Sequence, residues 1–470
     1  MKVLVALSIL FNGVVPSCSS KFISRSITTA FTRGGGCQPT KTTERKTFKL
    51  IQVQIIHRHG DRTPITPMAE REFWESTLPS KELLDKVAEK TKIIRKDNAA
   101  TQAHAAGGIG PFGKLTQLGL LQMVKVGEEI RSSLHLDDSN HHENEEVRSI
   151  DQDGHVHINH GCLFTNSNPI HPSKLKITST DFPRTIQSVQ ALLLGLFPEG
   201  YDGIIEIDAR HTDIMIPDPQ PRLSEEQVQL ERVLSQRSHL LEREKELEGI
   251  AGKVSEVLHH LIDHDAPSHN WGIGEETDVK QNIENQSSNG KKLTFSQLAE
   301  VMTCLKVRNR LPDGISEADY EIITSHSAWK WFENLRNQEL AKLAMKPFLT
   351  LITKTMQQAI INHYDEPIMH IYSCHDSSLI GLICALKLEQ PAKWPEYGSF
   401  LKVELFECHH PIHKGENGND TENYYVRFSL NGDILKSSWG VGCDGYPQAA
   451  EMISLKHLTS SIEDEHNNYK

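Results

Sequence analysis

The stretch LIQVQIIHRHGDRTP, residues 50–64, decides the fold. Its first half, residues 50–56, alternates and ends apolar, as a β-strand does. The strand leads directly into a turn in which Arg58 and Arg62 flank His59. Ligands of open α/β sheets bind beyond the carboxyl ends of the strands, so the stretch predicts a strand with a binding site at its end.

Further strand-like and helix-like segments alternate on both sides of a long helical block. The predicted strands are residues 175–180, 203–207, 368–373, 400–407 and 424–430, and predicted helices begin at 116, near 183 and at 379. Residues 223–361 are helical in pattern throughout, with capping signals at Ser224, Thr294 and Ser316. Strands that alternate with helices predict an α/β layer, and the helical block predicts a subdomain inserted in it.

The two ends of the chain are expected to lie outside this fold. Residues 1–20 have a positive start, a short apolar run and small residues at 17–19, which is the pattern of a secretory signal. A short helix resting on a membrane is the alternative. Residues 21–48, rich in Ser, Thr, Lys and Arg, are interpreted as a linker or a transit-like segment. Residues 456–470 are interpreted as a flexible tail.

The body of the chain divides into a core and an insert. The predicted α/β core covers residues 49–222 and 362–455, and the helical insert covers residues 223–361. The signal predicts the secretory pathway, with secretion, the endoplasmic reticulum or a lysosome- or vacuole-like compartment as the destination. An organelle reached through a signal plus a transit-like segment is the alternative. On the secretory route Asn285 and Asn419 are glycosylation acceptors.

Composition argues against two classes of protein. Lys and Arg total 50 and Asp and Glu total 62, which gives a formal net charge of −12, whereas a dedicated nucleic-acid binder needs a basic surface. No apolar run reaches the roughly 18 residues of a membrane span, so no integral span is expected. The polar, histidine-containing stretch 132–172 is interpreted as a surface insertion. Metal binding there is the less favoured interpretation, because histidines in such runs are ordinarily solvated.

The first chemical motif is RHGDRTP, residues 58–64. Arginine presents a planar fork of donors that suits phosphate oxygens, and Gly60 lets the backbone turn and approach a ligand closely. A histidine held between two such forks can attack phosphorus as a neutral imidazole. The run therefore predicts a phosphate site, with an ordinary basic surface turn as the alternative.

The second motif is STDFPRT, residues 179–185, in which a strand stops and a helix starts. Arg184 lies in the first helical turn, where a cation opposes the helix dipole. That cost is easier to understand if an anion binds there as well, since helix N-termini attract phosphates. A local pair between Arg184 and Asp181 is the alternative.

The third motif is SCHDS, residues 373–377, again at the end of a strand. His375 can donate a hydrogen bond to a phosphate oxygen. Asp376 can act as a general acid if its pKa is raised near the phosphate and held by burial. The alternative is that this pair merely caps the following helix.

Together the three motifs resemble the histidine acid phosphatase family of the phosphoglycerate-mutase-like superfamily. The resemblance covers roughly residues 50–450 and rests on the specific Arg-His-Gly-x-Arg-x-Pro motif. The helix at 115–122 also matches, with Leu-Thr-x-x-Gly-x-x-Gln. The resemblance implies a mostly parallel central sheet flanked by helices, with an inserted helical subdomain. It also implies hydrolysis of phosphate monoesters without a metal or other cofactor, because arginines and a histidine supply the positive charge.

The family's roles carry over to six residues of this chain. His59 would be the nucleophile, and Asp376 would protonate the leaving oxygen. The phosphate ligands would be Arg58, Arg62, Arg184 and His375. The implied reaction has two steps: His59 forms a phosphohistidine, and water then releases phosphate with Asp376 acting as a base.

Three short stretches are most similar to the lysophosphatidic acid phosphatase (type 6) branch of the family. They are KWP at 393–395, LGLF at 194–197 and GCDG at 442–445. The His-Asp pair at 375–376 also differs from the His-Ala-Glu pattern of phytase-like members. The resemblance implies a small phosphomonoester substrate, with lysophosphatidate, a lysophospholipid, as the candidate. Apolar positions in the helical insert are either its packing core or a groove for the acyl chain.

Other functions stay open at this point. A phytase or inositol-polyphosphate-type enzyme and a phosphosugar phosphatase are the nearest alternatives. A phosphomutase is less favoured, because mutases of central metabolism lack a secretory signal. A non-catalytic secreted anion-binding protein is also less favoured, because none of the six residues is missing. The sequence carries no signal for an oligomeric state.

Overall fold

A computed structural model describes residues 47–95, 110–134, 172–210, 214–217, 224–264, 293–362, 368–409, 423–440 and 449–463. Several predictions fall outside these residues. They are the signal, all but the last two residues of the segment 21–48, nearly all of the polar insertion 132–172, the stretch 442–445 and both glycosylation acceptors.

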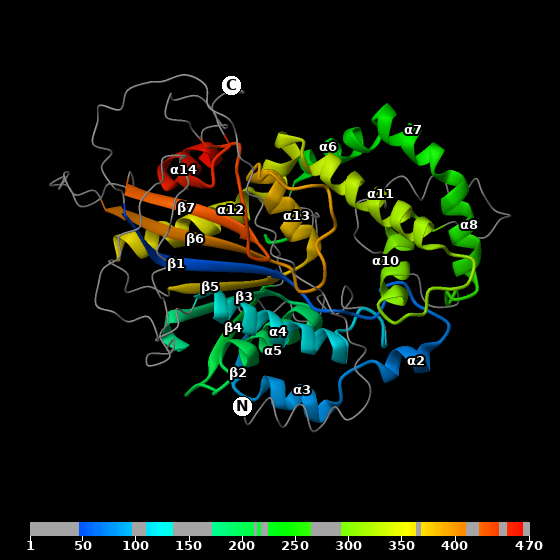
Figure 1. Ribbon diagram of the computed structural model, residues 1–470, viewed down its shortest axis with the longest axis horizontal. Coiled ribbons are helices and arrows are strands. Elements are labelled where there is room, and N and C mark those ends of the chain that lie inside the picture. Colours follow the sequence, from blue (N-terminus) through cyan, green and yellow to red (C-terminus); the bar gives the residue numbers. More distant parts are fainter. Residues whose placement is uncertain are drawn as a thin grey trace, which may run out of the picture.

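A single mixed sheet organises the described part of the chain (Figure 1). Nine strands are present there, in the order β2-β4-β3-β5-β1-β6-β7-β8, with β9 paired to β7. Their bounds are β1 Thr47–Arg58, β2 Thr91–Ile94, β3 Leu175–Thr180, β4 Ile205–Arg210, β5 Met369–Cys374, β6 Phe400–His409, β7 Tyr424–Leu430, β8 Asp433–Leu435 and β9 Met452–Ser454. Strands β1 to β5 are parallel to one another, and the remaining pairings are antiparallel. The predicted α/β fold with a largely parallel sheet is confirmed.

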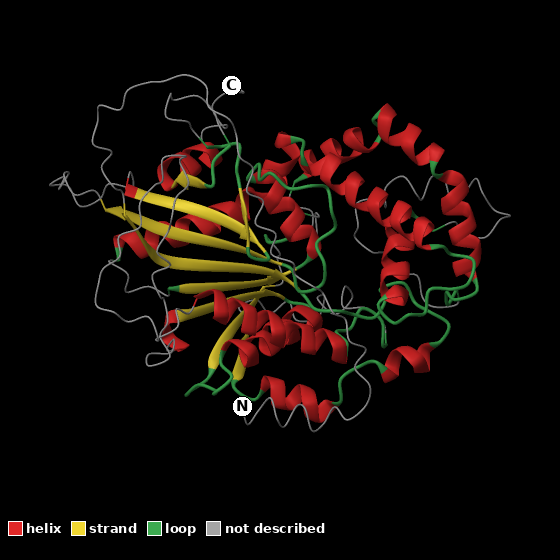
Figure 2. Cartoon of the chain, in the orientation of Figure 1, coloured by secondary structure: helices red, strands yellow, loops and turns green. Residues whose placement is uncertain are grey.

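Helices cover both faces of the sheet, as Figure 2 shows. One face is covered by α3 Lys81–Ala88, α4 Gln117–Leu134 and α5 Pro183–Leu196, and the other by α12 Gln338–Ile361, α13 Asp376–Ala385 and α14 Leu455–Glu463. Met123 and Leu192 pack with Val53 on the first face, and both are fully buried. Each such side chain contributes about 1.5–3 kcal/mol by leaving water, so the two apolar layers fix the sheet between them.

The crossing of α4 and α5 depends on two glycines. A Cβ on Gly127 would lie 2.1 Å from the carbonyl oxygen of Leu192, and a Cβ on Gly195 would lie 1.9 Å from that of Val124. No side chain fits at such distances, so the two helix backbones touch. The stretch at 194–197 therefore has a packing role, and it helps to hold α4 in place.

The helical block has a small core of its own. The block comprises α6 Glu225–Ser235, α7 Ser238–Glu246, α8 Glu248–His259, α10 Phe295–Lys306 and α11 Glu317–Leu335. Residues of α8, α10 and α11 form this core together with Trp74 of α2 Arg71–Ser76. Leu298, Val301 and Met302 are fully buried in that core. Capping boxes begin α10 at Thr294 and α11 at Ser316, as predicted. The interpretation of these apolar positions as packing core, in place of an acyl groove, is supported by their burial.

Two predicted boundaries differ from the structure. Helix α12, which the prediction assigned to the insert, packs on the sheet, because Ile352 and Met356 belong to the same buried cluster as Val403 of β6. Residues 456–463, which the prediction assigned to a flexible tail, lie in helix α14, where Leu455 and Leu458 are buried against that cluster. Leu455 and Leu458 are three residues apart, so both side chains lie on the same face of α14.

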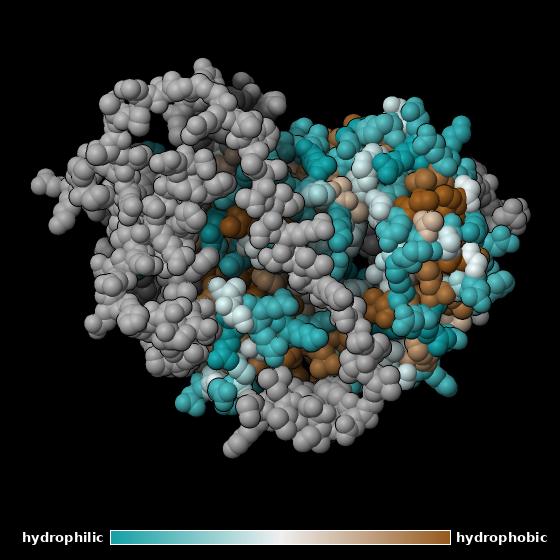
Figure 3. Space-filling model, viewed as in Figure 1, coloured by the Kyte–Doolittle hydropathy of each residue, from teal (hydrophilic) through white to brown (hydrophobic). Residues whose placement is uncertain are grey.

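The surface of the helical block is mostly hydrophilic in the view of Figure 3, with separate hydrophobic patches. Exposed large apolar side chains lie on different helices, among them Val233 of α6 and Leu241 of α7. Within the described residues, every helix is too short or too polar to cross a membrane.

Candidate active site

The order of the strands places the three motifs side by side. β3, β5 and β1 are adjacent and parallel, so their carboxyl ends meet at one edge of the sheet. Ser373 of β5 pairs with His57 of β1 on one side and with Ser179 of β3 on the other. The turns that follow these three positions carry all six predicted residues, and the sheet therefore brings those residues together.

His59 is oriented by its own turn. Its Nδ1 lies 2.8 Å from the carbonyl oxygen of Gly60, which accepts a hydrogen bond from a protonated Nδ1 and leaves a lone pair on Nε2. The ring centroid of His59 lies 5.5 Å from that of His375. Burial, and then the charges of neighbouring cations with Arg184 first, lowers the pKa of His59 well below 6.5. The imidazole therefore stays neutral in mildly acidic solution, which is the form a nucleophile needs.

The start of α4 holds the turn after β1. A Cβ on Gly60 would lie 2.4 Å from the carbonyl oxygen of Gly119, and a Cβ on Gly119 would lie 2.2 Å from that of Asp61. Gln122 Oε1 accepts a hydrogen bond from the Asp61 N–H at 2.8 Å. The Thr116 hydroxyl donates to Asp61 Oδ2 at 2.5 Å. These contacts give a physical reason for the Leu-Thr-x-x-Gly-x-x-Gln pattern at 115–122.

The three arginines share an unusual property. Arg58, Arg62 and Arg184 are 4%, 6% and 6% exposed. In each of them Nε is buried and makes no hydrogen bond. A buried donor without a partner costs about 1–3 kcal/mol, more when it is charged. Three such donors around one imidazole form a site for an anion with several oxygen atoms.

Arg184 is the least compensated of the three. Its Nη1 lies 3.5 Å from the carbonyl oxygen of Gly113, and its guanidinium carbon lies 4.5 Å from the ring centre of Phe182. The alternative partner Asp181 is paired with Arg95 instead, at 2.9 Å. Burial, followed by the charge of Arg62, lowers the pKa of Arg184 to about 9. The local pair that the sequence left open is therefore absent.

His375 joins the second and third motifs. It occupies the N-cap of α13, and its Nε2 lies 3.0 Å from the hydroxyl oxygen of Thr180. Its ring also contacts Phe182 edge to face, with the centroids 5.0 Å apart. Burial, and then the charge of Arg184, lowers the pKa of His375 well below 6.5. The His375 side chain therefore links the end of β3 to the start of α13.

Asp376 corrects one expectation from the sequence. Its Oδ2 lies 2.8 Å from Arg58 Nη2 and accepts a hydrogen bond from Trp394 Nε1 at 3.0 Å. Its Oδ1 accepts one from the Ser377 N–H at 2.9 Å. Burial acts to raise the pKa of Asp376, but the nearby cations, Arg58 first, outweigh it, and the pKa is lowered below 3.8. The condition that the sequence set for a general acid, a raised pKa, is therefore not met in this arrangement, in which an ionised carboxylate pairs with an arginine.

Comparison with known proteins decides the family. A family model described as the histidine phosphatase superfamily (branch 2) matches residues 49–431. The chain belongs to this superfamily. The family predicted from the motifs is thus confirmed, and so is its class as a phosphoric monoester hydrolase.

Relatives of this superfamily match most of the chain at low identity. Counting factor 60 of Dictyostelium discoideum is 23% identical over 420 residues, which cover 84% of this chain and 83% of that protein. Lysophosphatidic acid phosphatase type 6 of Mus musculus is 22% identical over 437 residues, covering 89% and 87%. Lysosomal acid phosphatase of Bos taurus is 22% identical over 437 residues, covering 89% and 79%.

Solved structures of phytases share the fold. The Hafnia alvei phytase in complex with tartrate has a TM-score of 0.52 at 14% identity, covering 89% of this chain and 97% of that one. The Citrobacter braakii phytase has a TM-score of 0.50 at 16% identity, covering 88% and 98%. At these identities the likeness shows the histidine phosphatase fold alone.

Sequence reasoning missed several side chains at this histidine phosphatase site. The Tyr397 ring centre lies 4.0 Å from the guanidinium carbon of Arg58, and burial raises the pKa of Tyr397 well above 10. Pro395 accepts a hydrogen bond from Arg58 Nη1 at 2.5 Å. Glu300 of α10 pairs with Arg62. The sequence marks the stretch 393–395 only by its family resemblance, and no sequence pattern links Glu300 to Arg62, which lies 238 residues earlier in the chain.

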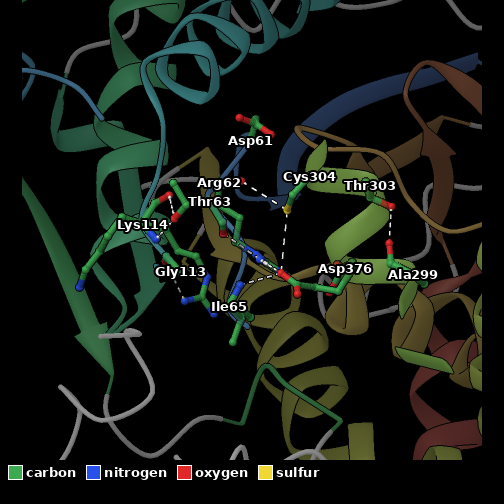
Figure 4. A network of polar contacts seen from close by, with 12 residues as sticks. Asp61, Arg62, Thr63, Ile65, Gly113, Lys114, Ala299, Thr303, Cys304 and Asp376 are labelled. Carbon is green, nitrogen blue, oxygen red and sulfur yellow. Dashed lines mark hydrogen bonds and ion pairs between the residues drawn. The ribbon is translucent and has the colours of Figure 1, made fainter. Parts of the chain in front are cut away.

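Figure 4 shows the polar contacts around Arg62, with Cys304 next to its backbone oxygen. Burial raises the pKa of the Cys304 thiol to about 12, so this thiol stays protonated. Among the described residues, no three His, Cys, Asp or Glu side chains are grouped so that they could hold a metal ion.

Proposed function

We propose that the chain hydrolyses phosphate monoesters through a phosphohistidine on His59. One observation carries the proposal: three buried arginines, each with an unpartnered Nε, surround a neutral imidazole with a free lone pair. A tetrahedral phosphate dianion offers enough oxygens to accept from all three. A neutral ligand would leave their charge buried and uncompensated.

The first step transfers the phosphoryl group to the enzyme. His59 Nε2 attacks phosphorus, and the bond between phosphorus and the leaving oxygen breaks. Asp376 donates a proton to that oxygen, so that an alcohol leaves. The arginines and His375 hold the equatorial oxygens, and their fixed charges stabilise the transition state.

Asp376 must be protonated for this step, although its pKa is low in the arrangement with Arg58. A bound phosphate dianion competes for the Arg58 guanidinium and adds negative charge near the carboxylate. Both effects raise the pKa of Asp376. Substrate binding would therefore favour the protonated form of Asp376, so that the proton donor forms when the ester is bound.

The second step hydrolyses the phosphohistidine and regenerates the free enzyme. Water attacks the phosphohistidine, Asp376 takes a proton from it, and the bond between phosphorus and Nε2 breaks. Inorganic phosphate leaves and the lone pair of His59 is restored. The hydrogen bond from Nδ1 to the Gly60 carbonyl holds the ring in one orientation through both steps.

We propose lysophosphatidate as the substrate to test first. Three relatives that match most of the chain are named lysophosphatidic acid phosphatase type 6. The stretch 393–395, which gave the same resemblance, contacts the proposed acid through Trp394 and the proposed phosphate ligand Arg58 through Pro395. The signal-like start and relatives named lysosomal acid phosphatase support a destination on the secretory route.

A panel of phosphate esters tests this function. Release of inorganic phosphate is measured at acidic pH from lysophosphatidate, an inositol polyphosphate, a hexose phosphate and a phosphotyrosine peptide. Faster release from lysophosphatidate than from the other three is expected. Preference for the inositol polyphosphate or the sugar would overturn the substrate, and no release from any ester would overturn the phosphatase function itself.

A further inference from the structure

Helix α10 of the helical block reaches the turn after β1. Glu300 and Cys304 lie four residues apart on α10, and Arg308 lies in the turn two residues beyond the end of this helix. Residues with this spacing lie on one face of a helix. All three contact residues 61–65, the turn that carries the proposed phosphate ligand Arg62.

Glu300 fixes one end of the Arg62 guanidinium. Its Oε1 lies 2.5 Å from Arg62 Nη1 and also accepts a hydrogen bond from the Ile65 N–H at 2.7 Å. Arg62 Nη1 donates to the Thr63 carbonyl as well, at 3.0 Å. The two charged side chains are only 8% and 16% exposed. Nη1 is thereby occupied, whereas Nε stays buried without a partner.

Arg308 forms a second ion pair with the same turn. Its Nη2 lies 2.7 Å from Oδ2 of Asp61, whose side chain is fully buried. Arg308 Nη1 also donates to the Cys304 carbonyl at 2.8 Å, and the Cys304 thiol lies 3.6 Å from the Arg62 carbonyl oxygen. The helical block is therefore joined to the turn by two largely buried ion pairs, one at Asp61 and one at Arg62.

We propose that Glu300 is a positioning residue for Arg62, so that one contact from helix α10 sets the geometry of a proposed phosphate ligand. This inference rests on the proposed phosphatase function. Glu300 occupies Nη1 and so leaves the rest of the guanidinium for the phosphate. Arginine has several rotatable bonds, and without this contact its charge would be spread over several positions. A misplacement of about 1 Å in such a site costs about 10²-fold in rate.

A double-mutant cycle separates positioning from a general effect on the fold. Glu300→Ala, Arg62→Ala and the double variant are compared with the unchanged protein by kcat/KM on an aryl phosphate. Glu300→Ala alone should lower kcat/KM by about 10²-fold. In the Arg62→Ala background it should lower it by no more than about threefold, because its target is gone. Equal losses in both backgrounds, or no loss at all, would overturn the proposal.

Three further variants distinguish a loss of positioning from misfolding. Glu300→Gln keeps the acceptor oxygen and should retain kcat/KM within about tenfold. Glu300→Asp keeps the charge but withdraws it by one methylene, and should lose at least tenfold with an unchanged Tm. Glu244→Ala is the matched control, because Glu244 pairs with Lys330 inside the helical block at 2.8 Å. It should leave kcat/KM unchanged.

The outcomes also separate this inference from the proposed function. If the unchanged protein releases no phosphate, the function has failed, and Glu300 is not at issue. If the unchanged protein is active and Glu300→Asp is equally active, the positioning role has failed while the function stands. Binding of inorganic phosphate, followed by calorimetry, gives a readout without turnover. It should weaken in Glu300→Asp and stay constant in Glu244→Ala.

Discussion

Replacing Arg184 by methionine should make the protein more stable and nearly inactive. Arg184 is buried, its Nε makes no hydrogen bond, and the nearest carboxylate in its own motif, Asp181, is paired with Arg95. Its charge therefore favours an anion and disfavours the folded protein alone. Methionine is close to arginine in length and carries no charge, so it removes that cost while filling most of the space.

The size of the effect follows from the lowered pKa. A fall from 12.5 to about 9 corresponds to about 5 kcal/mol, at about 1.36 kcal/mol per pH unit. The variant also loses the Phe182 and Gly113 contacts, and the surroundings of a buried charge relax. A net gain of about 1–2 kcal/mol in the free energy of unfolding remains, or a few degrees in Tm at about 2–4 °C per kcal/mol. The gain should be full below pH 9 and shrink as the pH rises further, because the folded-state pKa lies below the unfolded one.

Thermal unfolding in phosphate-free buffer, with and without added inorganic phosphate, measures this effect. Without phosphate the variant should melt higher than the unchanged protein. With phosphate at about 100 times its Kd, the unchanged protein gains about 2.7 kcal/mol and the order should reverse. kcat/KM should fall by about 10²–10³-fold, as for loss of one transition-state donor.

A matched arginine provides the control. Arg308 is also largely shielded, with 10% of its side chain exposed, but its charge is paired with Asp61 at 2.7 Å. Arg308→Met should therefore destabilise the protein by about 3 kcal/mol, because it leaves Asp61 buried and unpaired. If Arg184→Met destabilised the protein as Arg308→Met does, Arg184 would be compensated in the empty site, and the argument for an anion would be refuted.

Three further predictions test other parts of the account. Gly119→Ala should push the turn after β1 out of place, because the new Cβ would lie 2.2 Å from the Asp61 carbonyl oxygen; a loss of at least 10²-fold in kcat/KM is expected, and unchanged kinetics would contradict the close approach. Trp394→Phe removes a donor to Asp376 and so raises the pKa of that carboxyl, which should move the alkaline limb of the kcat–pH profile for an alkyl phosphate to higher pH; a shift to lower pH would exclude this role. Glu244→Gln should lower the free energy of unfolding by about 1 kcal/mol at pH 7, after discounting for solvent screening. The pKa of the Glu244 carboxyl is lowered from 4.5 to about 2, so the difference in the free energy of unfolding between the two proteins should vanish as the pH falls from 4.5 toward 2. A difference that does not depend on pH in urea titrations would count against the ion pair of Glu244 with Lys330.

The sequence predicted the strands and helices with strong local patterns. The strand at 175–180 and the helix at 183–196 match β3 and α5 residue for residue, because burial and turn chemistry agree there. The predicted strand at 203–207 starts two residues before β4, which begins at Ile205. The sequence pattern does not show at which residue pairing with the neighbouring strand starts. The short strands β2, β8 and β9 were missed, since three or four residues carry too little periodicity.

The site was predictable where it is local and unpredictable where it is assembled from distant parts. The three motifs could be read because each packs its polar residues into a few positions after a strand. The ion pair between Arg58 and Asp376, which lowers the pKa of Asp376, joins residues from two such motifs and has no sequence signature. The same is true of Glu300, whose contact with Arg62 depends on how the helical block is set against the sheet.

Trapping the covalent intermediate tests the central claim most directly. The protein is mixed with an aryl phosphate, quenched in alkali within the first turnovers, and digested for peptide mass mapping. The account predicts one acid-labile, alkali-stable phosphate on Nε2 of His59, and its complete absence from His59→Ala. A phosphate on another residue, or turnover that persists in His59→Ala, would contradict it.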